Sequence, residues 1–207
     1  MKQKRNHFYF FWRGLIKPFF WLFYRLKVTG REYVPDDGAY ILASNHRSAA
    51  DPFLLAIGLK RQVYFMAKAE LFENKFLSWF LHKLGAFPVE RGTSASKGAI
   101  QHFEKVVEDG NLMGIFIEGT RSKTGDFLPP KNGCSLIAYD TKTPVIPVCL
   151  TKIGSRVYIR YGKPLSLTDM GFEKGGAREF RNASRVIMDN IKQLREDDKA
   201  MVEAKNG

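Results

Sequence analysis

The chain has 207 residues, of which 44% are hydrophobic and 14% aromatic, and this composition excludes a disordered protein. Its 33 lysines and arginines against 21 aspartates and glutamates leave a net charge of +12, which favours anionic partners such as nucleic acid, anionic lipid or phosphorylated metabolites. The two cysteines, Cys134 and Cys149, lie in or beside apolar segments without a metal-binding or disulfide spacing, so we expect them to be small core residues.

Residues 1–28 differ in composition from the rest of the chain. Most side chains in residues 8–26 are aromatic or aliphatic, but Arg13, Lys17 and Arg25 interrupt them. A spanning helix needs about 20 predominantly apolar residues with few charges, and no small-residue cleavage site of a signal peptide follows. We therefore expect an aromatic amphipathic helix that anchors the protein at a membrane interface, with cations that reach anionic phospholipid. The alternative is a core helix of a soluble protein.

Residues 29–207 alternate between short apolar runs and helical patterns, which is typical of a single α/β domain. Strands separated by helices favour a mixed, largely parallel central sheet flanked by helices. Strands are predicted at 39–43, 62–67, 86–91, 112–117, 144–150 and 156–160, the last two paired through a turn at 152–155. Helices are predicted at 53–59, 74–84, 94–108, 134–139 and 173–198, the last with a charged, solvated face. The loop at 119–133 has a length that is usually functional.

A polar turn from Ser44 to Pro52 links the first predicted strand to the first helix that follows it. It places the imidazole of His46 and the carboxylate of Asp51 five residues apart. Neighbours on one helix face are three or four residues apart, so this pair cannot meet on a helix. Pro52 suits the first helical position and Asp51 the N-cap before it. We predict that His46 folds back toward Asp51 as a base with its orienting carboxylate, although such a spacing also occurs by chance.

Polar and cationic side chains gather where the predicted strands end. They are found at 45–51, Lys68, Arg91 and 118–122. Open α/β sheets bind ligands outside the carboxyl ends of their strands, so these groups suggest one pocket for an anionic substrate. Taken singly, Arg91 and Arg121 are more often surface ion-pair residues. No Gly-x-Ser-x-Gly elbow surrounds Thr120 or Ser122, which argues against a serine nucleophile.

Four short blocks follow one another along the chain: Asn45-His46 with Asp51, then residues 85–91, 116–122 and 145–148. In order and spacing they resemble the blocks of the glycerolipid acyltransferase family. Within that family the chain is similar to the bacterial 1-acylglycerol-3-phosphate (lysophosphatidate) acyltransferases over about residues 30–165. Two features depart from the family pattern: Ile117 stands where proline is usual, and the N-terminal segment is shorter and more charged than in many members.

The resemblance implies transfer of a fatty acyl group from acyl-CoA or acyl carrier protein to the sn-2 hydroxyl of 1-acylglycerol 3-phosphate, giving phosphatidate. It implies no metal and no cofactor other than the acyl donor. It assigns His46 as general base and Asp51 as the group that orients it. The acceptor is expected to be bound by Lys68, Arg91, Glu118, Gly119, Thr120 and Arg121. The cations would hold its phosphate, and Glu118 would fix an arginine or a glycerol hydroxyl or merely cap the following loop.

Other interpretations of the sequence stay open. Glycerol 3-phosphate or another lysophospholipid is the alternative acceptor. A non-catalytic basic protein on a membrane surface or on nucleic acid would also explain the charge, but no recognised nucleic-acid motif is present and nucleic acid is not the expected partner. The resemblance implies that the chain consists of an anchoring segment, 1–28, and an acyltransferase domain, 29–207. The protein is expected at the cytoplasmic face of the cell membrane, as a peripheral or monotopic protein.

Overall fold

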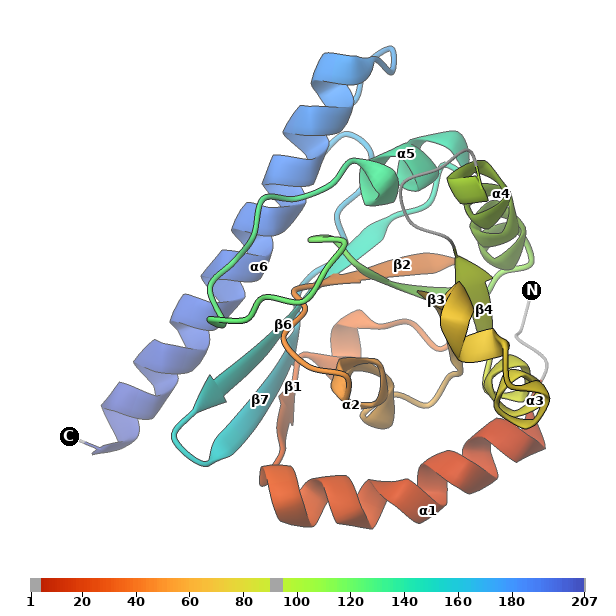
Figure 1. Cartoon of the computed structure of the whole chain (residues 1–207). Coiled ribbons are helices and arrows are strands. Elements are labelled where there is room, and N and C mark those ends of the chain that lie inside the picture. Colours follow the sequence, from red (N-terminus) through yellow and green to blue (C-terminus); the bar gives the residue numbers. More distant parts are fainter. Residues whose placement is uncertain (1–4, 90–94, 207) are drawn as a thin grey trace.

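A seven-stranded sheet runs through the computed structural model, which describes residues 5–89 and 95–206 (Figure 1). The strand order is β1-β7-β6-β2-β5-β3-β4. Five strands are parallel to one another, namely β2 (Tyr40–Ser44), β3 (Val63–Lys68), β4 (Ala86–Val89), β5 (Leu112–Phe116) and β6 (Val145–Ile153). β7 (Arg156–Tyr161) runs antiparallel to β6, and β1 (Lys27–Thr29) runs parallel to β7. The predicted mixed, largely parallel sheet is confirmed.

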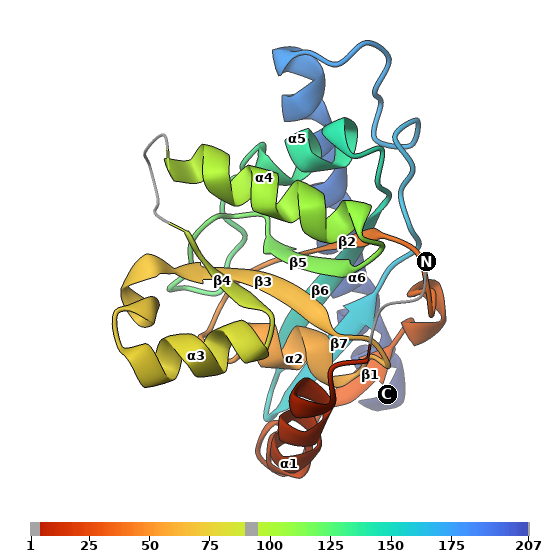
Figure 2. The same cartoon turned by 90° about the vertical axis from the view of Figure 1, so that its right-hand side faces the viewer.

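Helices cover both faces of the sheet (Figure 2). α4 (Ala95–Glu108), α5 (Gly133–Asp140) and α6 (Ala177–Asn206) pack on one face, whereas α1 (His7–Tyr24) and α2 (Asp51–Ile57) pack on the other. α3 (Lys75–Lys83) lies beside β4, and two single 3-10 turns, η1 (Arg31–Tyr33) and η2 (Ala69–Phe72), complete the chain. Each face of the sheet is therefore shielded from water, as an open parallel sheet requires.

The core consists of two apolar layers separated by the sheet. Alternation along β2 sends Ile41 and Ala43 into the layer under α4, α5 and α6, and Leu42 into the layer under α2. Cys134 and Cys149 are buried core residues, as predicted. Burial raises the pKa of the Cys134 thiol to about 12 and that of Cys149 to about 11, so neither is a thiolate nucleophile at neutral pH.

Two elements differ from the sequence prediction. The edge strand β1 was not predicted, because a three-residue run carries too little pattern to identify a strand. α6 spans Ala177–Asn206, so it begins four residues later and ends eight residues later than the predicted 173–198. Gly175 before it has a φ of +75°, and a Cβ there would lie 2.2 Å from Cζ of Tyr139. The chain can therefore enter the helix only after this left-handed position.

The N-terminal helix has one packed side and one exposed side. Asn6 caps it by accepting the backbone N–H of Tyr9 at 3.2 Å. The packed side meets α3 through Phe8 and Trp79, whose ring centroids are 5.5 Å apart. The other side exposes large apolar residues, namely Phe11, Leu15, Phe19, Trp21, Leu22 and Phe23. Among the described residues, no helix combines the length and apolarity needed to cross a bilayer.

Candidate active site

The His46 turn, residues 45–50, connects the carboxyl end of β2 to the start of α2. It is fixed at the centre of the sheet by Asn45. The side-chain amide of Asn45 donates to the carbonyl of Leu150 at 3.0 Å, and its oxygen accepts the Leu150 N–H at 2.9 Å. Asn45 is almost fully buried. Two complementary hydrogen bonds in a buried position hold the turn to β6.

His46 and Asp51 are in direct contact, as predicted from their spacing. Nδ1 of His46 lies 2.8 Å from Oδ2 of Asp51. The same oxygen accepts the backbone N–H groups of Arg47 at 2.5 Å and Ser48 at 2.8 Å. The prediction that Asp51 is the N-cap of the helix is wrong: Ala50 takes that position, and Asp51 is the first helical residue. Its carboxylate turns back because three donors of the turn converge on one oxygen.

This contact determines which nitrogen of His46 can act as a base. A carboxylate only accepts hydrogen bonds, so the Nδ1 proton points at Asp51, and Nε2 keeps its lone pair. Among the described residues, no group is hydrogen-bonded to Nε2. The imidazole lies on the ring of Phe116 with centroids 3.9 Å apart and planes inclined by 13°. Its side chain is 12% exposed and Asp51 is 2% exposed, so the base is reachable and its partner is not.

Glu118 fastens the turn to the loop that follows β5. Its Oε1 accepts the backbone N–H of His46 at 3.1 Å, and its Oε2 accepts that of Leu128 at 3.2 Å. Glu118 is 2% exposed. This burial raises its pKa, and the two N–H donors and the nearby His46 partly offset the effect. In the part of the chain that the structure describes, no arginine is paired with it, and its observed bonds are to backbone.

The loop from Gly119 carries three more of the predicted acceptor residues, Gly119, Thr120 and Arg121. Gly119 has a φ of +70°, which glycine adopts without strain, and it turns the chain outward. Thr120 and Arg121 are exposed, and within the described residues Arg121 has no hydrogen-bond or ion-pair partner. Ser122 is buried and shapes the loop, since its N–H donates to the His46 carbonyl at 2.8 Å and its hydroxyl accepts the Gly125 N–H at 3.0 Å.

Lys68 and Arg91 were predicted to join this site from neighbouring strands. Lys68 ends β3 at the same edge of the sheet and is exposed, opposite Val89 of β4. Arg91 lies outside the described residues. The structure thus joins His46 to both Asp51 and Glu118 by hydrogen bonds. Lys68 and Arg121 lie toward the same edge of the sheet and have no salt-bridge partner among the described residues.

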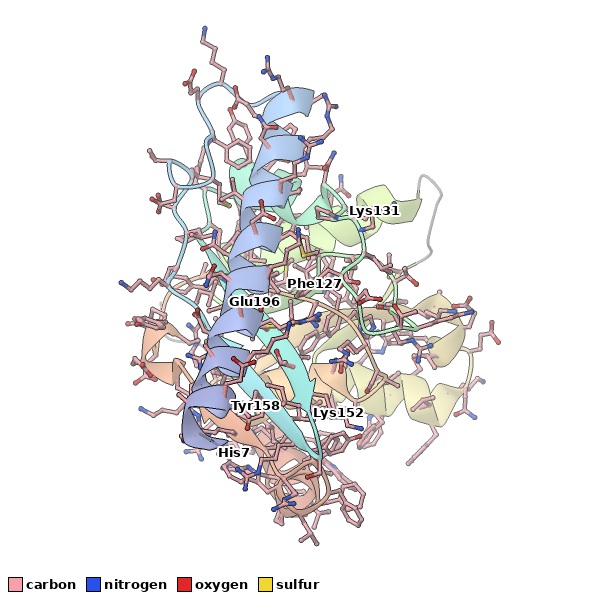
Figure 3. The ribbon with its side chains drawn as sticks, turned by 90° about the vertical axis from the view of Figure 1, so that its left-hand side faces the viewer. His7, Phe127, Lys131, Lys152, Tyr158 and Glu196 are labelled. Carbon is pink, nitrogen blue, oxygen red and sulfur yellow. The ribbon has the colours of Figure 1, made fainter. Side chains whose placement is uncertain are left out.

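Sequence reasoning missed the part that α6 takes in this region. Arg195 lies 3.6 Å from the ring centroid of Phe127 and donates to the carbonyl of Gly125 at 3.2 Å. Figure 3 shows Phe127 beside α6. The prediction of a solvated charged face is therefore wrong for Arg195, which is half-buried, and for Asp198, which is buried and bonded to Arg160 at 2.7 Å. In the sequence both residues look like other charges of an amphipathic helix.

The fold and the site define an α/β protein with an oriented imidazole at the carboxyl edge of a parallel sheet, which is the edge where open α/β sheets bind their ligands. The particular family follows from comparison with known proteins. The family model described as Acyltransferase matches residues 25–151, which is more than half of the chain. The chain belongs to the acyltransferase family.

Individual relatives agree with this assignment. A 1-acyl-sn-glycerol-3-phosphate acyltransferase of Bacillus subtilis is 39% identical over an alignment of 126 positions that covers 59% of this chain and 60% of that protein. The chain thus spans less than two thirds of that relative. A Streptococcus pneumoniae protein of the same name is 28% identical over 93% of this chain and 75% of its own length. The crystal structure of the 1-acyl-sn-glycerophosphate (LPA) acyltransferase of Thermotoga maritima superposes with a TM-score of 0.70 at 27% identity, covering 93% of this chain and 81% of that one.

Proposed function

We propose that this protein is a 1-acylglycerol-3-phosphate acyltransferase. It transfers a fatty acyl group from acyl-CoA or acyl carrier protein to the free sn-2 hydroxyl of lysophosphatidate, and the product is phosphatidate. The observation that carries the proposal is the 2.8 Å contact between His46 and Asp51 in a chain of the acyltransferase family. The names of the relatives support the choice of acceptor.

The chemistry uses His46 as the group that moves the proton. Nε2 accepts the proton of the sn-2 hydroxyl while the oxygen attacks the thioester carbonyl carbon. Asp51 stabilises the imidazolium that forms. As the carbon–sulfur bond breaks, the leaving thiolate takes the proton from Nε2, and no acyl-enzyme is needed. A hydroxyl is a poor nucleophile, and a positioned base contributes about 10²–10⁴-fold to the rate of such a step.

The acceptor phosphate is held by cations that project from the same edge of the sheet. Arg121 and Lys68 are exposed, and in the described part of the chain neither is in a salt bridge. A guanidinium binds phosphate oxygens through two parallel hydrogen bonds, which suits Arg121 to this role. Arg91 is the third cation of the proposal. Glu118, Gly119 and Thr120 give the loop the shape that brings Arg121 to the acceptor.

The protein acts at a membrane surface through α1. Leu22 is 74% exposed and Phe23 is 64% exposed, and they lie on the side of α1 that also presents Phe11 and Leu15. Lys17 of the same helix is exposed and can meet an anionic head group, worth about 1 kcal/mol near such a surface. Arg13, which was expected to do the same, instead donates to the carbonyl of Leu59. These features support binding to one leaflet, on the cytoplasmic face of the cell membrane, where the lipid acceptor is found.

The experiment is transfer of a labelled acyl group in detergent–lipid mixed micelles. Acyl-CoA and acyl carrier protein are tested as donors, and lysophosphatidate and glycerol 3-phosphate as acceptors. We expect transfer to lysophosphatidate and a fall in kcat of about 10²–10⁴-fold in His46→Ala. His7→Ala removes an exposed histidine of α1 and is the matched control, with near-parental turnover expected. Absence of transfer with every pair of substrates, or full turnover in a folded His46→Ala variant, would contradict the proposal.

A further inference from the structure

A cavity of about 310 Å³ adjoins the His46 turn on the side of the β6–β7 hairpin. Arg47 and Ser48 of the turn form one wall, the loop at 122–125 forms a second, and the end of β6 with Lys152 forms a third. Lys152 lies at the hairpin end of the sheet in Figure 3. The cavity also reaches Tyr24 at the end of α1. It is thus open to groups that arrive from solvent or along the N-terminal helix.

The cavity is lined with cations that lack a carboxylate partner. Arg47, Lys123 and Lys152 all line it, and among the described residues no aspartate or glutamate is in a salt bridge with any of them. Among the described residues that line the cavity, the one acid is Asp51, whose Oδ2 is already occupied by His46 and two backbone N–H groups. The hydroxyl of Ser48 supplies a further polar group. This chemistry suits a phosphate group, which binds several cations and donors together.

Arg47 is held in position rather than extended into solvent. It is half-buried and lies against the backbone of Gly125, where a Cβ would come within 2.5 Å of the Arg47 Nη2. Gly125 has a φ of +85°, a conformation that favours glycine. On the other side Arg195 donates to the Gly125 carbonyl. Arg47 therefore lines the cavity against the loop at 122–125, and this loop is itself held by Arg195. A cation that is already positioned loses less entropy when it binds an anion.

The phosphate that fits this cavity is not the one beside the reacting hydroxyl. His46 is absent from the lining, although its neighbours Arg47 and Ser48 are present. In lysophosphatidate the phosphate is attached to the carbon next to the one that bears the reacting hydroxyl, so it stays close to the imidazole. A phosphate in the cavity must belong to a longer ligand or to a second molecule.

We propose that this cavity binds a phosphate ester other than that of the acceptor. This inference rests on the proposed acyltransferase function. The phosphate ester comes from one of two sources: the phosphates of the soluble acyl donor, or the head group of an anionic membrane lipid. The first is separated from its thioester by a long flexible arm. The second arrives beside Tyr24 when α1 lies on the membrane.

Binding measurements test the inference without any need for turnover. The variant carries Lys123→Glu and Lys152→Glu, and the matched control carries Lys163→Glu and Lys174→Glu, two exposed lysines outside the cavity lining. The soluble probe is coenzyme A, measured by calorimetry. The lipid probe is phosphatidylcholine vesicles with and without phosphatidate, measured by sedimentation. We expect the cavity variant to lose roughly tenfold in affinity for at least one probe, equivalent to about 1.4 kcal/mol, and the control to lose much less.

The two arms identify the source of the phosphate. A selective loss of coenzyme A binding assigns the cavity to the donor, and a selective loss of the phosphatidate-dependent part of vesicle binding assigns it to a lipid head group. Equal affinities of the parent, cavity and control proteins for both probes overturn the inference, as does an equal loss in both variants. Lysine-dependent binding in a protein that transfers no acyl group would refute the proposed function and leave the inference standing.

Discussion

At the scale of single residues, His46 is fixed from several directions by groups that are distant in the sequence. Phe116 sets the plane of its ring and Asp51 sets its rotation. Glu118 accepts its backbone N–H, and Ser122 donates to its carbonyl. A base that is already oriented needs little reorganisation when it accepts a proton, which is how positioning lowers a barrier.

Replacing Glu118 by glutamine tests this orientation. A carboxylate offers two acceptor oxygens to the N–H groups of His46 and Leu128, whereas an amide offers one oxygen and a nitrogen that only donates. One buried N–H thus loses its partner, so we expect Glu118→Gln to lower the free energy of unfolding by about 1–3 kcal/mol and to lower kcat as well. Thermal unfolding and initial rates measure the two effects. Glu196→Gln, an exposed change on α6, is the control, and an unaffected Glu118→Gln enzyme would contradict the positioning role.

Arg121 has a different predicted role, because it is exposed and forms no bond that the described structure needs. We expect Arg121→Ala to raise the KM for lysophosphatidate about tenfold or more, since a charge-assisted bond to phosphate contributes roughly 1.5–3 kcal/mol, and to leave the unfolding temperature unchanged. Steady-state kinetics at saturating donor give this value. Arg178→Ala on α6 removes another exposed arginine for comparison. Parental KM and kcat in Arg121→Ala would remove it from the acceptor site.

At the scale of elements, the strands and helices that follow from local residue patterns could be predicted from the sequence. The strand, turn and helix around His46 follow from an apolar run, a polar segment and Pro52. The hairpin of β6 and β7 was also predicted and is confirmed. Two features could not be predicted, because each depends on a partner far along the chain. The edge strand β1 pairs with β7, and Arg195 donates a hydrogen bond to the carbonyl of Gly125.

Ile117 shows how a departure from a family pattern is accommodated. Its side chain is buried in the core, and its N–H donates to the carbonyl of Ser44 at 3.0 Å. Proline at this position could not make that bond, because it has no N–H. Here the pairing of β5 with β2 continues one residue further before the chain turns at Glu118. With isoleucine at this position, the His46–Asp51 contact is in place.

The exposed side of α1 is expected to bind the membrane, and this can be tested by substitution. We expect Leu22→Ser with Phe23→Ser to weaken binding to anionic vesicles, because burial of each large apolar side chain contributes about 1.5–3 kcal/mol. The two residues are mostly exposed, so the unfolding temperature should change little. Vesicle co-sedimentation measures the effect. Asn182→Ala with Gln193→Ala on α6 is the control pair, and equal vesicle binding by all three proteins would contradict the interfacial role of α1.

At the scale of the whole molecule, the pair of Asp198 and Arg160 ties α6 to the sheet. Nε of Arg160 lies 2.7 Å from Oδ1 of Asp198, while Oδ2 is buried without a hydrogen-bond partner among the described residues. Burial raises the pKa of Asp198, and Arg160 offsets this only in part. Between its ordinary and its raised pKa the folded protein keeps a proton that the unfolded chain has released, so this group lowers stability as pH rises through that window.

Asp198→Asn removes this titration and keeps an oxygen for Arg160. We therefore expect the free energy of unfolding of the variant, relative to the parent, to rise as pH increases from about 4, where the unfolded carboxyl titrates, to the raised pKa of the folded carboxyl. Denaturant unfolding at several pH values measures this difference. Asp189→Asn removes an exposed carboxylate of the same helix and is the control. A relative stability that falls over the same range would contradict the direction of the pKa shift.

The amide clamp between Asn45 and Leu150 joins residues 105 positions apart, and it has a consequence for how the protein folds. A chain that has folded only as far as β5 already contains His46 and Asp51, but β6 is not yet beside β2 to receive Asn45. Sheets built from such distant pairings form slowly, because the entropy of closing a long loop is lost before the stabilising contacts form. We therefore expect the His46 turn to be fixed in its working position only after β6 has paired with β2.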